Sequence, residues 1–199
     1  MTGAKNYEFF PAQEQFLRAD KRYLGYISGV GAGKTFVGNW RTWMNMEKWN
    51  PGEMGAIVAP TRQMIINVIL PEMRELGFLD DWEYRSSRSE NPGLHAPNGS
   101  RALLLSADNK KTIERLRGLN LAWWHIDESR DVPPRARQIL IQRLRKGDYT
   151  NGYVTSTPRG QNHDYDFFVG DVETDEYSHG EADIYEADDR LAITSVPTD

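Results

Sequence analysis

The stretch SGVGAGKT at residues 28–35, called the phosphate loop below, alternates glycine with other small or apolar residues before ending in lysine and threonine. The glycines allow a tight curve in which successive backbone N–H groups point at phosphate oxygens. Lys34 can then reach the terminal phosphates of a nucleoside triphosphate, and the Thr35 hydroxyl can ligate Mg²⁺. A glycine-rich turn without function is the alternative. We predict that ATP and Mg²⁺ are bound here by Ser28, Gly29, Val30, Gly31, Ala32, Gly33, Lys34 and Thr35.

A pair of acids, Asp127 and Glu128, follows the largely apolar stretch LAWWHI at residues 121–126. A buried strand there would release Asp127 at the C-terminal edge of the sheet, where open α/β sheets bind ligands. Asp127 is therefore predicted to hold Mg²⁺, and Glu128 to polarise the water that attacks the terminal phosphate. The alternative is that the acids only cap a strand and a turn. His125 is interpreted as a packed strand histidine, because no second histidine lies at metal-ligand spacing.

Three consecutive hydroxyl residues, Thr155, Ser156 and Thr157, end another predicted strand directly before Pro158. Their side chains would lie at the same edge of the sheet, where they could sense the γ-phosphate and pass its loss onward. Capping of a turn before the proline explains them nearly as well. The residues alone leave both interpretations open.

Alternating strands and helices favour an α/β fold with a mostly parallel sheet flanked by helices. Short runs of branched and aromatic residues predict strands at 23–27, 55–59, 121–127 and 152–157. The Asn98-Gly99 pair predicts a hairpin between LHAP and RALLL. Helices are expected from near residue 34, after residue 61, from about residue 109, and from residue 135 to about residue 146.

Composition restricts the class of protein. A length of 199 residues suits one domain, and the lack of cysteine excludes disulfide staples and thiolate metal sites. No apolar run could span a bilayer, and the first residues do not resemble a secretory signal, so we expect an intracellular protein without a membrane partner. The net charge of −5 argues against broad attraction to DNA, so any contact with nucleic acid requires a local basic patch.

Charge is segregated along the chain. Residues 130–146 hold six basic residues against one acid, whereas residues 164–189 hold eleven acids and no lysine or arginine. On the helix predicted over 135–146, Arg135 and Arg145 lie opposite an apolar stripe and could contact DNA phosphates. A solvated basic face or a subunit contact is the alternative. The acidic stretch is interpreted as solvated surface rather than as a nuclease site.

Five segments occur in an order and at distances that resemble the large terminase subunit of tailed double-stranded DNA bacteriophages: PAQEQFL, SGVGAGKT, IVAPTRQM, LRGLNLAWWHIDES and VTSTPRG. The resemblance spans nearly the whole chain. It implies a P-loop NTPase of the additional-strand, catalytic-glutamate type, whose ATP hydrolysis drives viral DNA into a procapsid. The partners it implies are double-stranded DNA, the portal protein of the capsid and the small terminase subunit. It also implies a homo-oligomeric ring, with a monomer as the alternative for the isolated domain.

The resemblance assigns roles to further residues. Gln13 resembles a glutamine that reads adenine, and residues 155–157 resemble a motif that couples hydrolysis to movement. Arg117 resembles a finger arginine that reaches into a neighbouring subunit's ATP site; capping of its own helix is the alternative. Many terminases carry an arginine inside the phosphate loop, at the position of Val30. Transition-state charge must then be met from elsewhere, by Arg117 or, in reserve, by Arg143 and Arg145.

The same resemblance implies an RNase H-like nuclease after the ATPase. We expect residues 1–199 to be the ATPase motor domain alone, without the nuclease, and to act in the host-cell cytoplasm. A helicase-like DNA-dependent ATPase is the nearest rival. A rival of another class is a nucleotide-switched assembly module with negligible hydrolysis. Glu128 distinguishes that module, because a switch needs no carboxylate to activate water.

Overall fold

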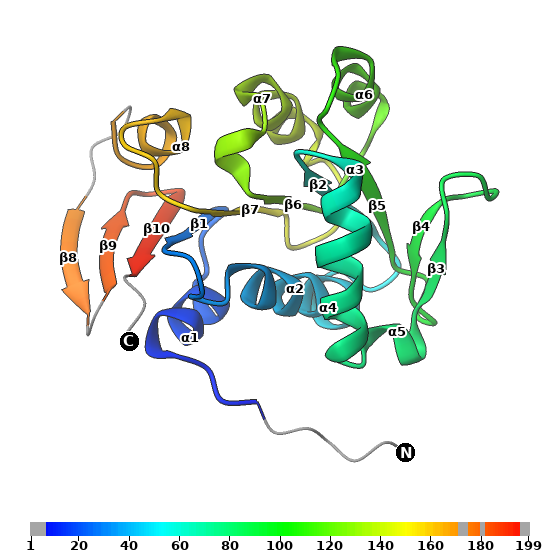
Figure 1. Cartoon of the computed structure of the whole chain (residues 1–199), viewed down its shortest axis with the longest axis horizontal. Coiled ribbons are helices and arrows are strands. Elements are labelled where there is room, and N and C mark those ends of the chain that lie inside the picture. The colour runs from blue at the N-terminus through cyan, green and yellow to red at the C-terminus, as the bar shows by residue number, and fades with distance from the viewer. Residues whose placement is uncertain (1–6, 171–174, 180–181, 196–199) are drawn as a thin grey trace.

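The computed structural model describes residues 7–170, 175–179 and 182–195. A ten-stranded sheet crosses it in the order β3-β4-β5-β2-β6-β7-β1-β10-β9-β8 (Figure 1). The strands are β1 (Tyr23–Ser28), β2 (Met54–Ala59), β3 (Glu83–Arg85), β4 (Gly93–His95), β5 (Arg101–Ser106), β6 (Trp123–Asp127), β7 (Asn151–Ser156), β8 (Asp175–His179), β9 (Ala182–Glu186) and β10 (Arg190–Ser195).

The inner strands β5, β2, β6, β7, β1 and β10 are parallel, and the outer strands at both ends are antiparallel. The predicted α/β fold with a mostly parallel sheet is therefore confirmed. The four strands predicted from apolar runs are present, and so is the hairpin, where Gly99 has a φ of +89°. Because the inner strands are parallel, their carboxyl ends meet at one edge of the sheet.

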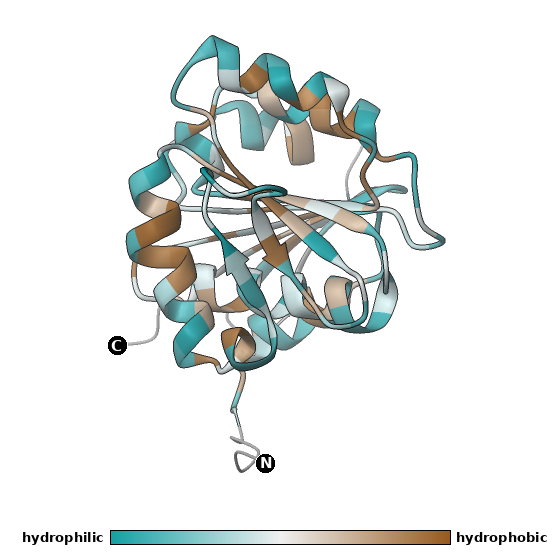
Figure 2. Cartoon of the chain, turned by 90° about the vertical axis from the view of Figure 1, so that its right-hand side faces the viewer, coloured by the Kyte–Doolittle hydropathy of each residue, from teal (hydrophilic) through white to brown (hydrophobic). Residues whose placement is uncertain are grey.

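Helices cover both faces of the sheet. The face below it in Figure 1 carries α1 (Pro11–Arg18), α2 (Lys34–Met44), α4 (Leu70–Glu75) and α5 (Phe78–Asp81), and α3 (Arg62–Met64) lies at the upper end of the helix that continues into α4. The face above it carries α6 (Lys110–Arg115), α7 (Pro134–Arg143) and α8 (His163–Tyr165). Figure 2 shows the two helical layers and the twisted sheet between them. Short π- or 3₁₀-helical segments extend several helices: η1 (Asn45–Trp49), η2 (Ile65–Ile69), η3 (Leu116–Gly118) and η5 (Asp166–Gly170). A further 3₁₀ turn, η4 (Ser129–Asp131), lies between β6 and α7.

Two apolar cores fill the spaces between the sheet and these layers. Successive side chains of a strand point to opposite faces, so Trp123 belongs to one core and Trp124 to the other. Both indoles are fully buried, and each crosses a glycine on a neighbouring strand. A Cβ on Gly55 would lie 2.0 Å from the Trp123 ring, and one on Gly152 would lie 2.1 Å from the Trp124 ring. These glycines therefore make room for the two largest side chains of β6.

Arg41 on α2 fixes the position of α1. Its guanidinium is fully buried and donates to the backbone carbonyls of Phe16, Leu17 and Ala19 at the C-terminal end of α1. A cation at this end complements the helix dipole and satisfies carbonyls that lack partners within the helix. The contact holds α1 against α2, and α1 carries Gln13.

Two predictions about the second half of the chain are wrong. The helix expected to reach residue 146 ends at Arg143, because Leu144 turns extended and forms a β-bridge with Leu121. The acidic stretch 164–189 is not merely solvated surface: it contains β8 and β9, and Asp164 within it is buried. Part of that stretch, residues 171–174 and 180–181, lies outside the described residues. Within the described part of the chain, no helix combines the length and apolar character needed to cross a membrane.

Candidate nucleotide-binding site

The phosphate loop joins β1 to α2 at the carboxyl edge of the sheet. Ser28 is the last residue of β1 and is fully buried, and α2 begins at Lys34. Gly31 and Gly33 have φ angles of +86° and +67°, a conformation that favours glycine. Val30 is 83% exposed. The curve and the helix start that the sequence predicts are thus both present.

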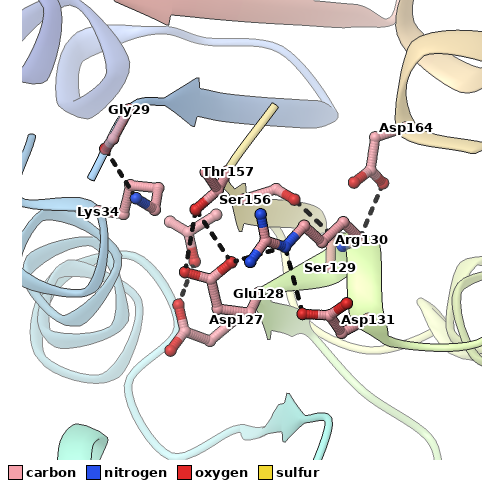
Figure 3. A network of polar contacts seen from close by, with 11 residues as sticks. Gly29, Lys34, Asp127, Glu128, Ser129, Arg130, Asp131, Ser156, Thr157 and Asp164 are labelled. Carbon is pink, nitrogen blue, oxygen red and sulfur yellow. Dashed lines mark hydrogen bonds and ion pairs between the residues drawn. The ribbon is translucent and has the colours of Figure 1, made fainter. Parts of the chain in front are cut away.

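Lys34 lies across its own loop. Its Nζ donates to the carbonyl oxygen of Gly29 at 2.8 Å, and the side chain is largely buried. The ammonium group is therefore held against the start of the loop, at Gly29 (Figure 3). A triphosphate entering the curve would meet a positive charge that is already in place.

Gln13 supports the phosphate loop from behind. Its Oε1 accepts from the backbone N–H of Phe10 at 3.1 Å, and its Nε2 donates to the carbonyl oxygen of Ala32, also at 3.1 Å. A Cβ on Gly33 would lie only 2.5 Å from the same Nε2. The structure thus gives this glutamine a role in shaping the loop, and adenine recognition by Gln13 stays a prediction.

Asp127 is the last residue of β6, and Glu128 follows it at the same edge of the sheet. Asp127 is buried, whereas Glu128 lines an open cleft together with Lys34 and Thr35. Glu128 has a φ of +45°, which is costly for a residue with a side chain. This left-handed turn separates the two acids: one remains under the sheet edge and the other faces the cleft. Figure 3 shows both carboxylates on the side of Lys34.

The hydroxyls of residues 155–157, at the end of β7, each bind a residue that ends β6 or lies in the loop after it. Thr155 Oγ1 donates to Asp127 Oδ1 at 2.7 Å, and Thr157 Oγ1 lies 3.3 Å from both carboxylate oxygens of Glu128. Ser156 Oγ accepts from the backbone N–H of Arg130 at 3.1 Å. Residues 155–157, predicted to couple hydrolysis to movement, therefore hold both predicted catalytic acids in place.

Burial controls the charges in this region. It raises the pKa of Asp127 to about 6, although the hydrogen bond from Thr155 and the charge of Lys34 act in the opposite direction. Asp127 Oδ2 is buried and has no hydrogen-bond partner among the described residues. Burial also lowers the pKa of His125 to about 3, so this imidazole is neutral. The interpretation of His125 as a packed strand residue is consistent with its complete burial and its ring stacking on Tyr153.

A cleft of about 410 Å³ opens between the phosphate loop, α4 and Glu128. Glu72 on α4 contributes to its wall and was missed by the sequence analysis. Burial raises the pKa of this carboxyl to about 7, and Asp127 and Glu75 add to the shift. Asn39 Nδ2 donates to Glu72 Oε2 at 3.2 Å. Asn39 lies four residues after Thr35 on α2, so the two side chains share one face of the helix. This spacing was the sequence signal from which a polar helix face at the cleft could have been predicted.

A buried ion pair on the other face of the sheet was also missed. Arg137 Nη1 pairs with Asp164 Oδ1, and Ser129 Oγ donates to the same oxygen at 2.8 Å. Burial lowers the pKa of Arg137, while the charge of Asp164 opposes that shift. Arg137 was counted among the six basic residues of 130–146. It is not available to DNA, because its guanidinium is buried and paired with Asp164. The pair instead anchors Ser129, the residue after Glu128.

The other basic residues are largely paired as well. Arg117 forms an ion pair with Glu114 and is about half exposed, and it does not line the cleft beside its own phosphate loop. Arg135 pairs with the same Glu114 at 3.0 Å. Arg145 lies beyond the end of α7 and donates to the carbonyl of Gln142, so it does not share a helix face with Arg135 as predicted. Arg143 donates to the carbonyl of Arg117.

The residues at this edge fit Mg²⁺ and a triphosphate. A Cβ on Gly31 would meet no atom within 4 Å, so space is open beside the backbone of the loop. Asp127 presents a buried oxygen that has no hydrogen-bond partner in the part of the chain that the structure describes, and a cation would satisfy it. Thr35 stands in the first turn of α2, next to Lys34 and at the positive end of the helix dipole.

The family model described as "Terminase large subunit, T4likevirus-type, N-terminal" matches residues 26–195. This range begins inside β1, at residue 26, and includes the phosphate loop and the later strands of the carboxyl edge discussed above. No curated protein matches the sequence.

Several solved structures are similar to this chain. The large terminase of a thermophilic bacteriophage, solved with ADP, is 20% identical, with a TM-score of 0.67 over 82% of this chain and 42% of that one. The ATPase domain of the Thermus phage P74-26 large terminase is 21% identical, with a TM-score of 0.57 over 81% and 70%. The large terminase of bacteriophage HK97 is 14% identical, with a TM-score of 0.59 over 77% and 34%. This chain thus spans less than half the length of the first of these proteins. At such identities the similarity supports the fold alone.

Proposed function

This chain belongs to the family of T4-like terminase large subunits, and from that membership we propose that it is an ATPase whose hydrolysis drives viral double-stranded DNA into a procapsid. The observation that carries the proposal is that the phosphate loop and the pair Asp127 and Glu128 meet at one edge of the sheet, where Lys34 and Glu128 line one cleft. The solved relative with ADP supports a nucleotide in that cleft.

We assign roles to the residues at the cleft from their positions. The backbone amides of residues 29–33 and the ammonium of Lys34 hold the β- and γ-phosphates. Thr35 and Asp127 hold Mg²⁺, which when bound neutralises charge on the phosphates. Glu128 orients and polarises the attacking water, and Thr157 keeps its carboxylate turned toward the cleft. Thr155 and Ser156 brace the loop that carries both acids.

The wider assembly is part of the same proposal. We place residues 1–199 as the motor domain, acting in the host-cell cytoplasm with double-stranded DNA, the portal protein and the small terminase subunit. A ring of copies would allow Arg117, which does not line its own cleft, to reach a neighbour's site. Its ion pair with Glu114 would then have to be exchanged for the partner's phosphates.

Phosphate release tests the assignment of the base. Glu128→Gln keeps the size of the side chain and removes its charge, so turnover should fall by about 10²–10⁴-fold while binding of ATP persists. Wild type and variant are compared alone and with portal and DNA. Equal turnover in both proteins would overturn the role of Glu128. Absent turnover in wild type under every condition would favour the nucleotide-switched module.

A further inference from the structure

His125 interrupts the otherwise apolar strand β6, and its whole side chain is buried. Its ring stacks on Tyr153, with centroids 4.7 Å apart and planes inclined by 16°. On its other flank α2 approaches so closely that a Cβ on Gly38 would lie 2.6 Å from His125 Cε1. The ring is therefore fixed in place by its neighbours. An apolar side chain would fill such a slot at lower cost, so the polar atoms of this ring need an explanation.

The polar contact of His125 leads directly to the predicted magnesium-binding acid. His125 Nε2 lies 2.8 Å from Thr155 Oγ1, and the same hydroxyl lies 2.7 Å from Asp127 Oδ1. A hydroxyl has one proton to donate. If Thr155 gives that proton to the carboxylate, it must accept from His125, and the neutral imidazole must carry its proton on Nε2. If Thr155 instead donated its proton to His125, a lone pair of the hydroxyl would face the negatively charged carboxylate of Asp127.

We propose that His125 is a positioning residue for the ATPase site: its Nε2–H binds Thr155 Oγ1 and so commits the single hydroxyl proton of Thr155 to Asp127. The inference rests on the function proposed above and deepens it. Asp127 Oδ1 is occupied by Thr155, which leaves Oδ2 for the metal, because no described residue forms a hydrogen bond with that oxygen. His125 touches neither nucleotide nor metal, and it acts through Thr155 alone. Groups that orient metal-binding residues in this way commonly change metal affinity by about 10–100-fold.

The tautomer can be read in the wild-type protein. Nitrogen NMR of ¹⁵N-histidine-labelled chain, with the signals of its four histidines assigned by substitution, distinguishes protonated from unprotonated ring nitrogens. We expect a protonated Nε2 and an unprotonated Nδ1 at His125. A proton on Nδ1 would overturn the proposal. This measurement requires no turnover, so it remains decisive even if the wild-type chain proves not to hydrolyse ATP.

Two amide substitutions provide a matched pair. The amide nitrogen of His125→Gln can reach the position of Nε2, whereas that of His125→Asn reaches only the position of Nδ1. Binding of a non-hydrolysable ATP analogue is measured over a range of Mg²⁺ concentrations and without metal. We expect His125→Asn to raise the Mg²⁺ concentration for half-saturation by about 10-fold. His125→Gln should stay within about 3-fold of wild type, and neither change should alter metal-free binding. Equal effects of the two substitutions would contradict the proposal.

A double substitution tests whether His125 acts through Thr155. Thr155→Val removes the hydroxyl, so adding His125→Asn should shift the Mg²⁺ dependence no further. Additive shifts would show that His125 acts by another route and would overturn the inference. Tyr153→Phe serves as the structural control, because it alters a buried hydroxyl bound to Thr42 and leaves the His125–Thr155–Asp127 contacts intact. Thermal melts identify any variant that fails to fold, and in that case the wild-type tautomer decides.

Discussion

The phosphate loop and the loop that follows β6 meet at one cleft, but they are built in different ways. The phosphate loop is held mainly by its own residues, since Lys34 bonds back to Gly29 and the glycines set its curve. At the end of β6 and in the loop after it, each residue from Asp127 to Arg130 bonds to a partner 26 to 35 residues further along the chain. The nucleotide-binding half is thus local in sequence, and the acidic half depends on tertiary pairing.

The largest expected effect tests that dependence. Asp164→Asn would leave the charge of Arg137 buried without its counter-ion and weaken the anchor of Ser129. We expect the free energy of unfolding to fall by about 3–5 kcal/mol in urea titrations, with nucleotide affinity of the folded protein retained. Asp183→Asn is the matched control, since this exposed carboxylate also accepts from a serine hydroxyl at 2.8 Å. Similar losses in both variants would remove the buried pair as an anchor.

Lys34→Ala should lower nucleotide affinity and leave stability nearly unchanged, the reverse of Asp164→Asn. Loss of the ammonium group removes charge stabilisation at the phosphates, so turnover should fall by about 10²–10³-fold and ATP affinity should fall with it. Stability should change little, because Lys34 makes one hydrogen bond within its own loop. Calorimetric titration with an ATP analogue measures the affinity. Lys21→Ala, which removes a lysine paired with Glu186 instead, is the control and should bind normally. Unchanged affinity in Lys34→Ala would show that the phosphate loop is not the nucleotide-binding half of the site.

Thr157→Val should have a smaller effect confined to the acidic half. It removes the hydroxyl that contacts both carboxylate oxygens of Glu128, while the strand end remains in place. A hydrogen bond to a charged group is commonly worth about 1.5–3 kcal/mol, so kcat should fall by about 10–150-fold with KM little changed. Steady-state ATPase kinetics measure both, with Thr112→Val on α6 as a control. A rise in KM alone would place Thr157 with the nucleotide-binding half.

The smallest effect concerns Glu72 and pH. Its pKa is raised to about 7 from 4.5, so between these values the folded protein keeps a proton that the unfolded chain releases. Stability contributed by this group is therefore present at low pH and declines as pH rises toward 7. Because Glu72 is only half-buried, solvent screening limits the change to on the order of 1 kcal/mol.

Glu72→Gln should reduce the decline in melting temperature between pH 4.5 and 7.5, most clearly above pH 6, because below pH 6 the raised pKa of Asp127 contributes a decline of its own. Glu75→Gln should keep most of it, because Glu75 is a lesser cause of the shift than burial and Asp127. An identical pH slope in wild type and Glu72→Gln would rule out Glu72 as its source.

The sequence by itself predicted the features whose conformation is local. The phosphate loop, the strand that delivers Asp127 and the hairpin at Asn98-Gly99 follow from glycine positions, apolar runs and turn residues. The same reasoning found β1, β2, β6 and β7 and, through the hairpin, β5, and these strands were enough to predict the α/β fold; it did not predict β10.

Only the tertiary structure decided which charged and polar side chains are buried and what they bind. Arg137 and Asp164 looked like solvated charges in opposite segments, yet they form one buried pair across 27 residues. Arg145 left the predicted helix face because Leu144 pairs with Leu121 instead of continuing α7. Glu72 and His125 gained their positions from α2 and β7, which pack against them. The cost of burying such groups depends on partners distant in sequence, which residue patterns along the chain do not reveal.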